Sequence, residues 1–140
     1  MMRIIEWRRD PRRIRLPVLI LRASPAADVT GEAGTALIDT GSTVSGVATG
    51  IVETLGLRRR GRKPIASAQG LRDAERYAFR IGLIPDYSPP GRPVSPFVFE
   101  PVVGIELPDH FEFDALLGMD VLGQCDFAMN RRGACRLVFG

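Results

Sequence analysis

The chain has 140 residues, of which 45% are hydrophobic and 25% are charged, and its formal net charge is +3. This composition is typical of a soluble globular domain. A length of 140 residues is enough for one domain but too short for a protein built from two lobes. The sequence contains no long apolar run and no signal-peptide pattern. We therefore expect no membrane partner and a cytoplasmic location.

Arginine dominates the basic residues, because Lys63 is the one lysine among 19. This bias favours a bacterial coding preference over a ligand preference. The basic residues cluster at residues 8–15 and 58–63. Such clusters can contact nucleic acid or an acidic partner, but solvated faces and protected strand edges are the more ordinary explanation. No aromatic pattern accompanies them, so we expect no nucleic-acid partner.

The N-terminal third is expected to form a hairpin that presents an acid. Residues 1–11 end at Asp10-Pro11 and are predicted to be a mobile or docking tail, which leaves residues 12–140 as the domain. Residues 14–21 alternate between apolar and polar and are predicted to be the first strand. After a turn, residues 35–38 are predicted to form the strand that leads directly into Asp39.

The segment of residues 36–43 reads Ala-Leu-Ile-Asp-Thr-Gly-Ser-Thr, so a buried strand delivers Asp39 into a tight turn. A carboxylate there must be paired, hydrogen-bonded or protonated, and Gly41 lets the backbone fold closely against a neighbour. Far downstream, residues 114–122 contain an apolar pair followed by glycine, Leu116-Leu117-Gly118. The two segments, in this order, resemble the catalytic loop and the supporting strand of retropepsin-like aspartic proteases.

The resemblance implies an all-β fold, a retropepsin-like closed β-barrel or sandwich with one or two short helices. Aspartic-protease chemistry needs two facing carboxylates, and this chain has a single Asp-Thr-Gly. The resemblance therefore implies a homodimer whose active site takes Asp39 from each subunit. The resemblance assigns catalytic roles to Asp39, Thr40 and Gly41. It implies that Ser42 donates a hydrogen bond to Asp39 and takes part in substrate binding. It also implies that Leu116, Leu117 and Gly118 support the loop.

The middle of the chain is predicted to contain a short helix and a hairpin. Residues 47–57 place their apolar side chains on one helical face, and Gly56 is a natural C-cap. Residues 62–68 and 75–84 flank a polar, glycine-bearing centre, which is the pattern of a hairpin. By resemblance this hairpin is the flap that closes over peptide, and a plain surface hairpin is the alternative. The residues assigned to its substrate-binding tip are Ser67, Ala68, Gln69 and Gly70.

The last third returns to strands. Residues 85–93 are too rich in proline for a strand or helix and are predicted to be a loop. Residues 94–105 alternate like strands, and residues 119–124 are predicted to be a short helix. Residues 125–129 and 134–139 form a predicted hairpin with Ala128 opposite Cys135, which leaves Cys125 and Cys135 as free thiols. By resemblance, residues 136–139 join the chain ends in a dimer sheet.

Other chemistries lack their residues. His110 is the single histidine, no Gly-x-Ser-x-Gly elbow is present, and one histidine with two cysteines makes no metal-ligand set. We expect neither a metal nor a cofactor. The predicted function is an aspartic endopeptidase that cuts an extended peptide or protein substrate. The alternative is a non-catalytic dimerisation or peptide-binding module with the same fold.

Overall fold

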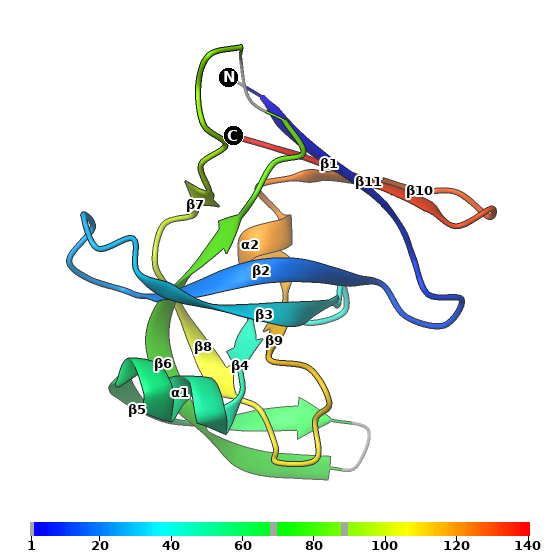
Figure 1. Cartoon of the computed structure of the whole chain (residues 1–140). Helices are drawn as coiled ribbons and strands as arrows, with labels where there is room; N and C mark the ends of the chain where they lie inside the picture. The colour runs from blue at the N-terminus through cyan, green and yellow to red at the C-terminus, as the bar shows by residue number, and fades with distance from the viewer. Residues whose placement is uncertain (1, 68–69, 88–89) are drawn as a thin grey trace.

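Figure 1 shows the computed structural model of the chain, which describes residues 2–67, 70–87 and 90–140. The described residues form strands joined by tight turns, with two short helices. The all-β class expected from the sequence is confirmed. In chain order the elements are β1 (Arg3–Arg8), β2 (Arg15–Arg22), β3 (Gly31–Ile38), β4 (Gly46–Val47), α1 (Thr49–Leu55), β5 (Arg58–Ser67), β6 (Gly70–Leu83), β7 (Phe97–Val98), β8 (Val102–Glu106), β9 (Ala115–Leu117), α2 (Met119–Leu122), β10 (Asp126–Met129) and β11 (Ala134–Phe139).

The larger sheet has the strand order β2-β3-β9-β4-β8-β6-β5, and β7 pairs with β6. Strand β2 also pairs with β6, so the path of hydrogen-bonded strands returns to its start. Strands β3 and β9 run parallel, and Ile38 lies opposite Leu117. Across the described ranges, no helix is both long enough and apolar enough to cross a membrane.

The smaller sheet joins the two ends of the chain in the order β1-β11-β10, and Figure 1 shows these strands at the top of the view. The expected mobile or docking tail therefore contains a strand that is paired along its whole length, from Arg3 opposite Phe139 to Arg8 opposite Ala134. The outer edge of β1 is also engaged, because the Glu6 N–H donates to the Asp86 carboxylate (2.9 Å). Ladder hydrogen bonds and the burial of Ile5 hold this segment in place.

One core holds the two sheets and α1 together. Phe79, Ile81 and Leu83 of β6 are completely buried, as is Leu117 of β9. The helix contributes its expected apolar face and ends at Gly56, whose left-handed conformation (φ 61°) caps it. The other buried apolar side chains of this core are Ile5, Leu16, Val18, Ile20, Ala36, Ile38, Val47, Val52, Leu55, Leu57, Phe99, Ala115, Val121, Leu122, Leu137 and Phe139.

The C-terminal hairpin forms as expected, but its register differs by one residue. Met129, and not Ala128, lies opposite Cys135, because Gly133 adopts a positive φ of 96° and adds a residue to the turn side of β11. The expectation of free thiols is confirmed for both Cys125 and Cys135. Burial, with a smaller contribution from the charge of nearby Asp126, raises the pKa of the Cys125 thiol to about 11.

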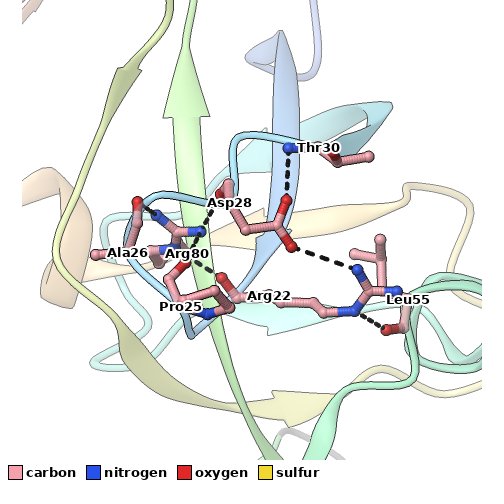
Figure 2. Close-up of polar contacts among 7 residues, drawn as sticks. All are labelled: Arg22, Pro25, Ala26, Asp28, Thr30, Leu55 and Arg80. Atoms are coloured by element: carbon pink, nitrogen blue, oxygen red, sulfur yellow. Dashed lines mark hydrogen bonds and ion pairs between the residues drawn. The ribbon is translucent and has the colours of Figure 1, made fainter.

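Arg80 of β6 fastens the loop between β2 and β3 (Figure 2). Its side chain is only 5% exposed. The guanidinium donates to the carbonyl oxygens of Arg22 (2.6 Å), Ala26 (3.1 Å) and Pro25 (3.3 Å) and also to that of Asp28. A buried cation is thus satisfied by four backbone acceptors from the end of β2 and the loop that follows it.

Replacing Arg80 with methionine keeps the apolar stem and removes every donor. We expect Arg80→Met to lower the free energy of unfolding by about 3 kcal/mol or more, since four hydrogen bonds from a charged group are lost and such bonds contribute about 1.5–3 kcal/mol each. Urea denaturation measures this loss. The matched variant Arg22→Met removes a hydrogen bond to the Leu55 carbonyl oxygen and a longer contact with the Asp28 carboxylate, and should cost about 1 kcal/mol. Equal losses in the two variants would contradict the assignment.

The two thiols should react slowly while the chain is folded. Burial also raises the pKa of the Cys135 thiol. At about pH 8 we expect an aromatic disulfide reagent to modify both cysteines much more slowly in the native protein than in urea, because the thiolate is the reactive form. The pKa of Cys125 is raised above its ordinary value of 9.0, so its contribution to stability is complete below pH 9.0 and is lost as the pH rises towards 11. Urea denaturation over this range measures the loss.

Candidate active site

Asp39 stands at the end of β3, where the parallel pairing with β9 places it. The Asp39 N–H donates to the Leu117 carbonyl oxygen (3.0 Å), which continues the ladder one residue beyond the Ile38–Leu117 pair. The residue is partly buried, while Thr40 and Gly41 beside it are exposed. The buried side of this turn is therefore fixed by the sheet, and its outer side is open.

The turn orients the Asp39 carboxylate from within. The Gly41 N–H donates to Oδ1 of Asp39 (3.0 Å), and the Ser42 N–H donates to the Asp39 carbonyl oxygen (3.2 Å). A Cβ at Gly41 would lie 3.3 Å from Oδ1, which is tighter than most van der Waals contacts. A hydrogen bond from a backbone N–H fixes the direction of a carboxylate oxygen.

Glycine at position 118 allows the segment after Asp39, residues 40–44, to lie directly against the end of β9. A Cβ at Gly118 would lie 2.5 Å from the Val44 carbonyl oxygen and 2.9 Å from that of Ser42, so any larger residue would push the loop away. The Met119 N–H donates to the Ser42 carbonyl oxygen (2.8 Å). The expected bond from Ser42 to Asp39 is replaced, because the Ser42 hydroxyl donates its one proton to the Val44 carbonyl oxygen (2.6 Å).

A partly buried pair that the sequence did not reveal lies beneath this loop. Ser45 is completely buried, and its hydroxyl donates to Oδ1 of Asp120 (2.6 Å) while its N–H donates to Oδ2 (3.0 Å). The same hydroxyl accepts the Gly118 N–H (3.1 Å). Ser45 therefore connects the segment after Asp39 with the end of β9 and with the first turn of α2. No sequence spacing pairs two residues so far apart.

The β5–β6 hairpin forms as expected, and Ser67 lies opposite Gly70 at its end. Gly70 has a positive φ of 112°, which favours glycine. In Figure 1 the end of β5 and the start of β6 lie on the same side of the view as the end of β3. Ala68 and Gln69, the other two predicted tip residues, lie outside the described residues. The substrate-binding role of the tip stays a prediction.

A cavity of about 520 Å³ adjoins the last two residues of β3, directly before Asp39. Its lining combines buried or half-buried apolar side chains with exposed arginine, glutamate and histidine side chains. Arg13 on the rim pairs with Glu112 and lies over the Phe113 ring (5.8 Å). The cavity is of the size that ligand pockets have. It is lined by Arg12, Arg13, Ile14, Leu37, Ile38, His110, Phe111, Glu112 and Phe113.

Within the ranges that the structure describes, no group of three histidine, cysteine, aspartate or glutamate side chains is placed to hold a metal ion. The groups gathered at the turn are therefore one carboxylate, backbone N–H donors and hydroxyls. A lone carboxylate so arranged can accept a proton or orient a water molecule. It cannot act as the base and as the acid in the same step.

The architecture is similar to a crystal structure of a retropepsin-like aspartic protease from Rickettsia conorii, with a TM-score of 0.64 and 14% sequence identity over 99% of this chain and 92% of that chain. It is also similar to EIAV protease complexed with the inhibitor HBY-793, with a TM-score of 0.49 and 19% identity over 79% of this chain and 86% of that chain. Comparison of the sequence with protein-family models and with curated proteins finds no match. The likeness to the Rickettsia structure shows that this chain has a retropepsin-like fold.

The Ser45–Asp120 pair should stabilise the turn as a unit. We expect Ser45→Ala and Asp120→Ala each to lower the free energy of unfolding by about 2 kcal/mol, because each leaves a buried polar partner unpaired. The double variant should lose much less than the sum, with a coupling energy of about 1 kcal/mol or more. Urea denaturation of the four proteins measures the coupling. Thr49→Ala, which removes a single bond to Glu106, is the control, and simple additivity of the Ser45 and Asp120 losses would refute the coupling.

Proposed function

We propose that the protein is an aspartic endopeptidase that acts as a homodimer, with one Asp39 from each subunit in a shared active site. The observation that carries the proposal is the turn at Asp39 on a retropepsin-like fold, where the Leu117 carbonyl and the Gly41 N–H hold an acid at an otherwise open surface. The single Asp-Thr-Gly of the chain supports the dimer, because the chemistry needs a second carboxylate.

The proposed mechanism uses the two carboxylates in opposite protonation states. Two carboxylates in close contact do not both ionise, so the pair holds one proton and titrates as a unit. The ionised Asp39 takes a proton from a water molecule held between them, while the protonated Asp39 donates to the oxygen of the scissile carbonyl. Attack of that water gives a tetrahedral diol, which collapses with cleavage of the C–N bond. No covalent intermediate with the enzyme forms.

The neighbours of Asp39 would position it. Thr40 is exposed, so its hydroxyl and N–H are available to bond across the two-fold axis to the partner's loop. Gly41 lets that loop approach and orients one carboxylate oxygen. Leu117 and Gly118 hold the turn from beneath, and Leu116 pairs with Leu37 one step earlier in the ladder. These are positioning roles, because none of these side chains supplies a proton.

The smaller sheet, β1-β11-β10, is here called the terminal sheet. The strand edge that it offers for a dimer contact belongs to β10 and not to β11. Residues 136–139 were expected to join a dimer sheet, but β11 already lies between β1 and β10 of its own chain. The outer edge of β1 is engaged by Asp86. Among the described strands, β10 pairs only with β11. Its outer edge is therefore the place where a second copy would extend the sheet.

An extended peptide would lie between the β5–β6 hairpin and Asp39 and bind as an added strand. The proposed contacts at the hairpin tip are Ser67, Ala68, Gln69 and Gly70. Ser42 would contribute through its backbone, since its hydroxyl is bonded to Val44. The cavity beside β3 offers space for one side chain of the peptide. We propose a cytoplasmic location for this activity.

The decisive experiment is a cleavage assay on a mixture of peptides, analysed by mass spectrometry, with and without a statine-type inhibitor. We expect Asp39→Asn to lower the cleavage rate by about 1,000-fold or more while leaving the folded dimer intact, because the amide can neither activate water nor share a proton. Glu100→Gln makes the same carboxylate-to-amide change at an exposed site and should keep full activity.

Three results would decide between the alternatives. Inhibitor-sensitive cleavage that is lost in Asp39→Asn supports the peptidase. Full cleavage by Asp39→Asn would refute it. A dimer that binds peptides but never cuts them, measured by light scattering and peptide titration, would favour the dimerisation or peptide-binding module.

A further inference from the structure

The turn of the β10–β11 hairpin and the end of β1 enclose a second cavity, of about 380 Å³, whose lining is mostly arginine. We call it the arginine cavity. The proposed peptidase activity uses none of its residues, although two of them belong to the first basic cluster of the sequence. Its lining residues are Arg8, Arg9, Pro11, Arg131, Arg132 and Gly133.

Backbone contacts bring these two distant segments together. The Arg9 N–H donates to the Gly133 carbonyl oxygen (2.9 Å), directly after the last ladder pair, in which Arg8 lies opposite Ala134. The turn itself is fixed by the Asn130 side chain, whose Oδ1 accepts the N–H groups of Arg132 and Ala134 (3.0 Å each). Backbone hydrogen bonds and the Asn130 side chain therefore hold the two segments of the cavity, and neither the Arg131 nor the Arg132 side chain takes part in these bonds.

Gly133 permits a close approach of one guanidinium. Its positive φ of 96° suits glycine, and a Cβ at this position would lie 3.4 Å from Nη2 of Arg8. That nitrogen donates to the Arg132 carbonyl oxygen. The turn thus holds Arg8 against the hairpin, on the same cavity as exposed Arg131 and Arg132.

The four arginines of the cavity have no counter-charge. Among the described residues, no carboxylate lies within ion-pair distance of any of them, whereas Arg59 and Arg62 of β5 share Glu75. The Nε of Arg9 is buried and has no hydrogen-bond partner. Gathering four positive charges and burying an unpaired donor both cost free energy, and a bound anion would offset both costs.

We propose that the arginine cavity binds a small ligand with two or more linked phosphate groups. Guanidinium groups present planar pairs of donors that match phosphate oxygens, and four of them suit a ligand with several negative charges. The volume is that of a small-molecule pocket. The lining contains no aromatic side chain on which a base would stack, so single-stranded nucleic acid fits it poorly.

The ligand would hold two segments of the chain together. It would contact the end of β1 and the β10–β11 turn together, which are the outer parts of the terminal sheet. A ligand that binds only the folded state stabilises it in proportion to its occupancy. Phosphate binding would therefore raise the thermal stability of the terminal sheet, independently of any peptidase activity.

The test is a titration of the full chain with sodium pyrophosphate at constant ionic strength, followed by calorimetry and by the melting temperature. Arg131→Ala/Arg132→Ala removes two exposed charges from the cavity and leaves the backbone bonds in place. Arg58→Ala/Arg60→Ala removes two exposed charges from β5 and is the matched control. Circular dichroism checks that both variants are folded, and fluorescence of Trp7, the single tryptophan, gives an independent signal beside Arg8.

We expect saturable binding to one site and a rise in melting temperature for the wild-type protein. The affinity should fall at least about 10-fold in Arg131→Ala/Arg132→Ala and stay unchanged in the control. Equal weakening in both variants would overturn the proposal, because it would indicate a diffuse effect of net charge. Absence of saturable binding to the wild type would also overturn it, as would tighter binding of a glutamate-rich peptide or a duplex oligonucleotide than of pyrophosphate.

Discussion

The parallel pairing of β3 with β9 is the constraint on which the candidate site depends. It places the Leu117 carbonyl where it accepts the Asp39 N–H, and it places Gly118 where only glycine leaves room for the Val44 carbonyl. Two parallel strands cannot be joined by a tight turn, and the chain between β3 and β9 contains all the strands from β4 to β8. The position of the acid is therefore a property of the whole closed sheet and not of the turn alone.

Features that depend on nearby residues could be predicted from the sequence. The turn at Asp39, the helix capped by Gly56 and the two hairpins each follow from side-chain periodicity and glycine placement within a short segment. The placement of residues 116–118 beside the turn at Asp39 was also predicted, because the two motifs occur in the chain in the order that the resemblance requires. In each case the local preference and the final packing agree.

Features that depend on distant partners could not be predicted. The strand β1 looks like a tail because its pairing partner, β11, lies at the other end of the chain. Ser45 and Asp120 are ordinary polar residues until the fold buries them against each other, and Arg80 is one arginine among many until four carbonyls surround it. The one-residue shift in the last hairpin has a similar cause, because the extra residue at Gly133 accompanies its contact with Arg9.

The proposed function also accounts for the open side of the turn at Asp39, where a second copy would bind. Hydrogen bonds involving Leu117, Gly118 and Met119 reach the turn and the residues after it from the sheet and α2, on the inner side. Thr40 and Gly41 remain exposed on the outer side. A single carboxylate there has one protonation state at a time, so it cannot supply the base and the acid that peptide hydrolysis requires in one step. A partner's Asp39 at the open side would provide the missing group and, through the shared proton, would set the two acids to different states.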